Sequence, residues 1–293
     1  MMRNIILLVC SIFFGACSLP AQIIPAVDEC ANPDSDWIFC ENFDSGKPLK
    51  RKGGFGGTKG PAKVVDNQGI GGSSAWEATY HPGTVGAGDL QLFFGDTPKS
   101  MNNGIREGEH FREIYYRFYL RMSEGWSGVP DKMSRASVFA KDDWSQAMVA
   151  HVWGATSGRG LRLDPVNCST KDYIRCSGYN NIGAFTWLKA RDGWSQIHAP
   201  EYNNRWICIE TNVKLNTPGE PDGEQQLWVD DKFDTARTGL DFIASYKKHG
   251  INGIFLENYW NKGEAPATQK RWIDNFVVST KRIGCRPTTP LAK

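Results

Sequence analysis

The sequence predicts an all-β protein, built as a sandwich of two packed antiparallel sheets. The chain of 293 residues contains 31 Gly and 11 Trp, and short segments of alternating apolar and polar residues follow one another along it. Alternation at a period of two is typical of half-buried strands. Turn signals rich in Gly and Pro separate these segments, and few long amphipathic runs indicate helices. Strands at this spacing favour a β-sandwich.

The first residues have the pattern of an export signal. Arg3 precedes an apolar run over residues 5–14, which small residues follow, and this run is too short to cross a bilayer. Two cleavage sites fit. FGAC, ending at Cys17, resembles a bacterial lipobox, whereas LPAQ contains an ordinary cut after Ala21. We expect a signal peptide over 1–21, one domain over 22–293, and an exported protein that meets a membrane only through a lipid on Cys17.

Six cysteines lie beyond the signal, and an even number in an exported chain indicates disulfides. They are Cys30, Cys40, Cys168, Cys176, Cys208 and Cys285. Many connectivities are open to six cysteines. The locally short pairs are Cys30–Cys40 and Cys168–Cys176, which leaves Cys208–Cys285. No CxxC pair occurs, so the sequence does not indicate a zinc site.

Each strand is expected from its own alternation. After a basic, glycine-rich loop over 46–61, the expected strands cover residues 73–80, 89–95, 109–122, 136–143, 146–154, 158–165, 206–216, 225–232, 251–260 and 270–284. A turn at 142–144 joins one pair, and the turn 217–224 makes a hairpin of another. Residues 236–250 are expected to hold one short helix.

The segment 109–122 has one apolar face and one unusual polar face. Its second face carries Glu113, Tyr115, Arg117, Tyr119 and Arg121. Tyrosines interleaved with arginines suit a surface that grips something flat, hydroxylated or anionic, although a solvated outer face remains an alternative. A net charge of only +2 gives no indication of a nucleic-acid partner.

Two C-terminal segments, WICIETNVKLNTPGEPDGEQQLWVDDK and RWIDNFVVSTKRIGC, carry a resemblance, with a looser match at FCENFDSG. They resemble a bacterial and fungal group of concanavalin A-like jelly rolls, which includes fungal glucuronan lyases and a cellulose-induced secreted jelly-roll protein. The resemblance implies a β-jelly-roll with a concave cleft, a structural calcium ion and a polysaccharide as target. It also implies that Cys208 pairs with Cys285. We expect an acidic polysaccharide as partner and a monomer.

The resemblance places calcium ligands at Asp44 and Asp274. Calcium takes several oxygen ligands, and backbone carbonyls near Gly71 to Ser73 are expected to supply more. Without a metal, Asp44 would cap a turn and Asp274 would accept hydrogen bonds only.

A lyase acting on a uronic-acid polymer by β-elimination must neutralise the carboxylate, remove the C5 proton and protonate the leaving oxygen. Arg117 is expected to neutralise the carboxylate, with Asn212 assisting. His151 is the expected base, and Tyr115 or Tyr119 the acid. The strands of Arg117 and His151 are expected to be neighbours in the concave sheet, so that the two side chains converge. His151 shares its face with apolar residues, so a structural histidine is the alternative, and the resemblance places an arginine near this position.

The remaining polar strand residues and loop tryptophans are expected to bind substrate; these are Arg121, Arg162, Asp164, Glu210, Trp144 and Trp260. Aromatic faces stack on sugar rings, although core packing is the ordinary role of a tryptophan. We therefore expect a secreted or lipid-anchored polysaccharide lyase. The alternatives are a carbohydrate-binding protein without activity and a glycoside hydrolase, which requires a pair of carboxylates.

Overall fold

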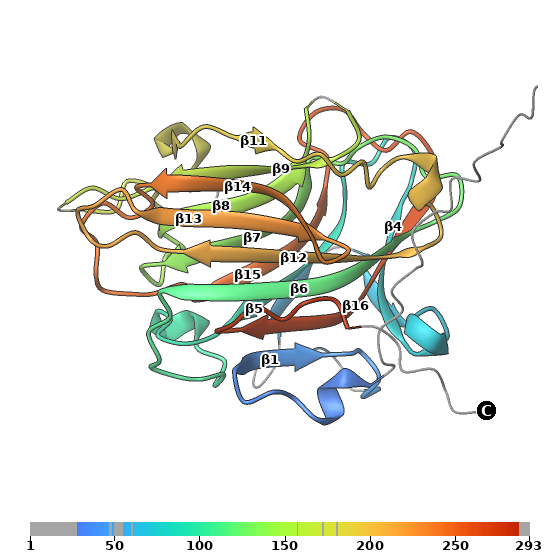
Figure 1. The fold of residues 1–293 in the computed structure, drawn as a ribbon, viewed down its shortest axis with the longest axis horizontal. Helices are drawn as coiled ribbons and strands as arrows, with labels where there is room; N and C mark the ends of the chain where they lie inside the picture. The colour runs from blue at the N-terminus through green and yellow to red at the C-terminus, as the bar shows by residue number, and fades with distance from the viewer. Residues whose placement is uncertain are drawn as a thin grey trace, which may run out of the picture.

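The chain folds into two antiparallel sheets that pack face to face, as the two layers of strands in Figure 1 show. This computed structural model describes residues 28–46, 49, 55–59, 61–156, 158–171, 173–179 and 181–286. The expected signal peptide and Cys17 lie outside the described residues. No helix in the described part of the chain has the length and apolar character needed to span a membrane.

Within the described residues, each sheet contains eight strands. Sheet A follows the order β14 (Lys232–Leu240), β13 (Gly223–Val229), β12 (Trp206–Lys214), β6 (Glu113–Met122), β16 (Gln269–Ser279), β4 (Ala75–Tyr80) and β3 (Lys63–Val65), with β1 (Trp37–Glu41) pairing β16. Sheet B follows the order β10 (Thr186–Trp187), β9 (Leu161–Asn167), β8 (Gln146–Gly154), β7 (Lys132–Phe139), β15 (Gly253–Tyr259), β5 (Gly86–Phe93) and β2 (Phe55–Lys59), with β11 (Arg191–Asp192) pairing β9. The predicted jelly-roll sandwich is confirmed.

The core lies between the inner faces of the two sheets. On β6 the alternation places Ile114, Phe118 and Leu120 in it, and all three are fully buried. Leu90 of β5 and Ile254 of β15 contribute from sheet B. Because every second residue of a strand points inward, the residues between them must lie on the two outer faces of the sandwich.

Two local predictions are wrong. Residues 55–59 of the expected loop 46–61 form β2 at the edge of sheet B. Residues 236–240 of the expected helix complete β14, which pairs with β13, and no helix follows within 241–250. Cross-strand pairing offers the backbone of this segment a full ladder of hydrogen bonds, which its weak helical pattern does not outweigh.

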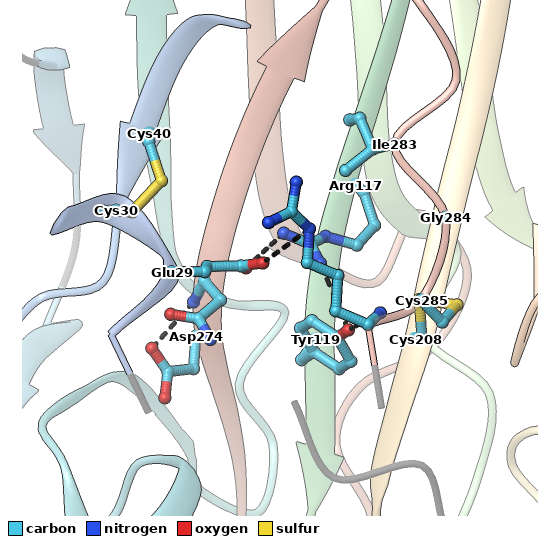
Figure 2. Close-up of polar contacts among 12 residues, drawn as sticks. Glu29, Cys30, Cys40, Arg117, Tyr119, Cys208, Asp274, Ile283, Gly284 and Cys285 are labelled. Atoms are coloured by element: carbon cyan, nitrogen blue, oxygen red, sulfur yellow. Dashed lines mark hydrogen bonds and ion pairs between the residues drawn. A yellow bond between two sulfur atoms is a disulfide. The ribbon is translucent and has the colours of Figure 1, made fainter. Parts of the chain in front are cut away.

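Three disulfides join the cysteine pairs expected from the sequence, Cys30–Cys40, Cys168–Cys176 and Cys208–Cys285. The first holds the 3-10 turn η1 (Glu29–Ala31) to β1, and the last holds the C-terminal segment to β12. These bridges are typical of an exported protein. Figure 2 shows η1 and the segment 283–285, each held by its disulfide, on either side of Arg117 of sheet A.

Candidate functional site

Two adjoining hollows lie on the outer face of sheet B. The first, of about 500 Å³, is lined by residues of β5, β7 and β15, among them Asp89, Lys132 and Tyr259. The second, of about 390 Å³, is lined by residues of β8, β9 and β10. Asn261 lines both hollows, so together they form one trough across the sheet.

The strand register places a polar row beneath the first hollow. Asp89 of β5 lies opposite Glu257 of β15, and Lys132 of β7 lies opposite Tyr259 of β15. These residues alternate with core residues such as Leu90 and Leu256. The alternation that builds the core on one side therefore builds the floor of the hollow on the other.

Glu257 lies between two cations at the floor. Its Oε1 atom is 3.7 Å from Nε of Arg135 and 4.0 Å from Nζ of Lys132. Burial lowers the pKa of Lys132 from the ordinary lysine value, and Arg135 lowers it further, while Glu257 opposes the change. Since burial disfavours the charged ammonium, the neutral amine that can accept a proton becomes more accessible.

Two other groups in the first hollow can exchange protons or hydrogen bonds with a ligand. Tyr259 is 40% exposed, and Nζ of Lys132 lies 5.0 Å from the centre of its ring. The exposed Asn261 carries an amide at the junction of the two hollows. An amine, a phenol and an amide therefore meet in one solvent-accessible space.

His151 of β8 lies on the same face of sheet B but is covered. Its exposed fraction is 2%, and its ring contacts Trp153 at 4.6 Å and Trp187 at 6.0 Å between centroids. Nδ1 donates to the carbonyl oxygen of Asp164 at 3.0 Å, because a carbonyl can only accept. Burial and the neighbouring Arg135 lower the pKa of His151 well below its ordinary value. The neutral, covered ring fits the structural alternative.

The expected convergence of Arg117 and His151 is wrong. β6 belongs to sheet A and β8 to sheet B, so the two side chains lie on opposite outer faces of the sandwich. Arg117 is fully buried and pairs with Glu29 of η1. It also donates to the Tyr119 hydroxyl at 3.1 Å, and its guanidinium stacks on the Tyr119 ring (Figure 2). A terminal segment, rather than a ligand, covers this arginine.

The other residues expected from this face stay with Arg117 on sheet A, and none of the described β6 residues lines either hollow. Tyr119 accepts from the backbone of Arg286, and burial raises its pKa to about 12. Burial also raises the pKa of Tyr115 to about 12. Arg121 stacks between Trp206 and Trp272. These contacts hold the sheet and the terminal segments together.

Asn212 and Glu210 of β12 also lie on sheet A. Asn212 donates to Glu113 at 3.1 Å. Glu210 accepts from the backbone nitrogens of Ile283 and Gly284 at 2.7 and 3.1 Å, which fastens the C-terminal segment. The expected contribution of these two residues to a shared cleft with His151 is therefore wrong for the same topological reason.

Of the four remaining predicted residues, two line the second hollow and two pack against other side chains. Arg162 and Asp164 of β9 line the second hollow, and their role in substrate binding stays a prediction. Trp144 instead packs edge-on against Phe139 in a satellite cluster. Trp260 is 7% exposed and belongs to the main core.

Asp44 and Asp274, the expected calcium ligands, both accept hydrogen bonds from the segment 69–74. Asp44 accepts from the backbone nitrogen of Ser74 at 2.7 Å, and Asp274 accepts from that of Ile70 at 2.8 Å and from the Ser73 hydroxyl at 3.1 Å. Burial raises the pKa of Asp274 to about 7, and Asp44 adds to this rise. Two neighbouring carboxylates and a hydroxyl are oxygen donors of the kind calcium takes. The described residues contain no group of three or more His, Cys, Asp or Glu placed to hold a metal, so backbone oxygens would have to complete the shell.

The strand pattern contained a signal for the residues that the sequence analysis missed. Lys132 and Arg135 precede the expected strand 136–143, which begins too late to include them. Asp89 alternates with Leu90, and Glu257 and Tyr259 alternate with Leu256 within predicted strands. Charged residues at the outward positions of several strands point to a functional face, but only pairing shows that these strands are neighbours.

Several solved structures with a similar fold are polysaccharide lyases. The endo-β-1,4-glucuronan lyase of the fungus Trichoderma reesei superposes with a TM-score of 0.55 at 15% identity, covering 84% of this chain and 96% of that one. A Chlorella virus alginate lyase, vAL-1, gives 0.54 at 13% identity, covering 77% and 91%. The marine PL-14 alginate lyase of Aplysia kurodai gives 0.55 at 12% identity, covering 84% and 99%. At these identities the likeness shows the fold. Neither family models nor curated proteins match the sequence.

Proposed function

We propose that this protein is a polysaccharide lyase that cleaves a uronic-acid-containing glycan by β-elimination in the first hollow. The observation that carries the proposal is the position of Lys132, a lysine of lowered pKa beside the exposed Tyr259 in that hollow. The lyases of the same fold support the choice of reaction. We further propose that the protein acts outside the cytoplasm, secreted or anchored through Cys17.

The proposed roles follow from the chemistry of elimination. The neutral amine of Lys132 accepts the C5 proton of the uronate. The Asn261 amide donates a hydrogen bond to the carboxylate, which stabilises the charge that develops there. As the C4–O bond breaks and a C4–C5 double bond forms, the Tyr259 hydroxyl donates its proton to the leaving oxygen. Lys132 then passes its proton back through solvent to Tyr259.

A second candidate function rests on the pair Asp89 and Glu257. These residues lie directly opposite each other on neighbouring strands and line the first hollow. Directly opposed residues have Cβ atoms about 5 Å apart, and glycoside hydrolases use two facing carboxyl groups. Glu257 is 4% exposed and lies near Arg135 and Lys132, so the lyase remains the better supported reaction.

One assay separates these functions. The protein is incubated with glucuronan, alginate, pectate and hyaluronan, and both the ultraviolet absorbance of unsaturated uronate and the release of reducing ends are followed. A lyase produces the two signals together. Reducing ends without absorbance identify a hydrolase, and binding without either signal identifies a carbohydrate-binding protein.

Matched variants locate the chemistry. Lys132→Met and Tyr259→Phe should each abolish most of the absorbance signal while the protein stays folded. Lys247→Met and Tyr173→Phe change exposed residues outside both hollows and should leave the signal unchanged. Full activity in Lys132→Met would remove the proposed base.

A further inference from the structure

The second hollow has the construction of a binding site next to the proposed reaction site. Trp187 of β10 is 40% exposed and lines the hollow together with Trp153 of β8. Large exposed aromatic rings are unfavourable in water, so a ring that lines a concave surface marks a binding site more often than a scattered one.

Several contacts hold the Trp187 ring in place. It meets Trp153 edge-on at 5.8 Å and Phe185 edge-on at 5.4 Å between centroids. On the sheet side it lies nearly parallel to the covered His151 ring, at 6.0 Å. The neutral imidazole therefore has a clear mechanical role, because it supports an aromatic platform. A platform fixed in advance loses little conformational entropy when a ligand stacks on it.

Positive and negative charges that line the second hollow are equal in number, and several of these groups already have hydrogen-bond or ion-pair partners. Arg162 lies 3.5 Å from Asp192 and donates to the Thr156 hydroxyl at 2.8 Å. Asp131 accepts from the backbone nitrogens of Asn261 and Lys262. Asp164 is half-buried, and burial raises its pKa. Over the lining as a whole, two cations, Arg162 and Lys262, face two carboxylates, Asp131 and Asp164.

We infer that the second hollow is a subsite for a neutral sugar of the same glycan chain, stacked on Trp187 and recognised through its hydroxyl groups. A pyranose offers an apolar face to an aromatic ring and hydroxyls to mixed donors and acceptors, as found here. A balanced lining gives no net attraction to a second carboxylate. Because Asn261 lines both hollows, the neutral sugar is a neighbour of the uronate at the reaction site.

This inference rests on the proposed function and makes its substrate more specific. The preferred glycan contains a uronate next to a neutral sugar, and is not a polymer of uronate alone. The test compares hyaluronan oligosaccharides, in which glucuronate alternates with a neutral amino sugar, with glucuronan oligosaccharides of the same length. Binding is measured by calorimetry in the Tyr259→Phe background, and KM and kcat in the otherwise unchanged protein.

We expect the mixed oligosaccharide to bind more tightly, and Trp187→Ala to weaken its binding about tenfold, as the loss of an aromatic stacking contact would. Trp187→Phe should restore part of this affinity. Trp194→Ala is the matched control, because Trp194 is exposed outside both hollows. In turnover, Trp187→Ala should raise KM more than it lowers kcat.

Two results would overturn the subsite. One is unchanged binding in Trp187→Ala relative to Trp194→Ala. The other is tighter binding of the all-uronate oligosaccharide, with that preference lost in Arg162→Gln, which would show carboxylate recognition. Failure of the proposed function differs from both: no unsaturated product would form from any glycan, while the effect of Trp187→Ala on binding would remain.

Discussion

Arg135 and His151 lie directly opposite each other in the antiparallel register of β7 and β8. The guanidinium stacks on Tyr179 and Phe255 at 4.6 Å from each ring centre, while the imidazole supports Trp153 and Trp187. Aromatic rings thus enclose both Arg135 and His151 beneath the trough. The residues that reach the solvent-filled space, Lys132 and Tyr259, lie beside them.

Arg117 should matter for stability and not for turnover. Arg117→Met leaves the buried Glu29 with only Arg286, 3.9 Å away, as an ion-pair partner, and removing one member of a buried pair costs about 3–5 kcal/mol. Urea unfolding measures this loss. The double variant Glu29→Gln with Arg117→Met should recover part of it, and folded Arg117→Lys should keep the wild-type kcat. A large loss of kcat in folded Arg117→Lys would contradict the assignment.

The pKa of Lys132 should determine the pH at which kcat rises. Because burial lowers its pKa below the ordinary value of 10.5, kcat should rise with pH through a midpoint below that value as the amine becomes neutral. Initial rates between pH 6 and pH 10, in buffers of constant ionic strength, measure the midpoint. Glu257→Gln removes the carboxylate that opposes the lowering of the Lys132 pKa, so it should move the midpoint of the kcat profile to lower pH. A midpoint that does not move would show that the rise in kcat does not report the titration of Lys132.

The buried histidines should make the protein sensitive to acid. Burial lowers the pKa of His198 from 6.5 to about 3 and that of His151 well below 6.5. Below pH 6.5 the unfolded chain binds protons that the folded protein excludes. The stabilisation is therefore present above pH 6.5 and is lost as the pH falls towards 3. Urea unfolding of His198→Gln should show a shallower decline over this window than the wild type, and equal slopes would exclude the contribution of His198.

Calcium should stabilise the fold through Asp44 and Asp274. Adding calcium after chelation should raise Tm, because an ion that binds only the folded state shifts unfolding by mass action. Magnesium should raise it less, since it retains water in preference to a protein cage. Asp274→Asn should lose the response to calcium. The same rise in Tm in that variant would place the ion elsewhere.

The disulfide between Cys208 and Cys285 should contribute more stability than the one between Cys168 and Cys176. The first closes a sequence separation of 77 residues and the second one of 8. Loop-closure entropy then predicts losses of about 4.5 and about 2.5 kcal/mol when each pair is replaced by serine. Chemical unfolding of the two double variants measures the difference. Equal losses would show that the C-terminal segment stays in place without its bridge.

The all-β class, most of the strands and the three cysteine pairs could be predicted from the sequence alone. These features depend on local alternation, turn residues and short separations, or on a resemblance that quoted segments carry. The inward face of β6, with Ile114 and Phe118, followed directly from a period of two. The sequence also places His151, Arg162 and Asp164 on strands, where the structure has them, but it paired His151 with Arg117, which lies on the other sheet.

Which outer face is open to a ligand could not be predicted from the sequence, because it depends on how the strands are arranged in three dimensions. Arg117 on β6 and Arg135 on β7 have the same local signature, a cation at an outward strand position. Segments distant in sequence distinguish them: η1 and the C-terminal residues cover Arg117, whereas the trough lies above β7 and β15. Alternation specifies which side of a strand faces out, but it contains no information about strand order or about what covers a face. Those are set by long-range pairing and packing, and here they placed the trough on sheet B.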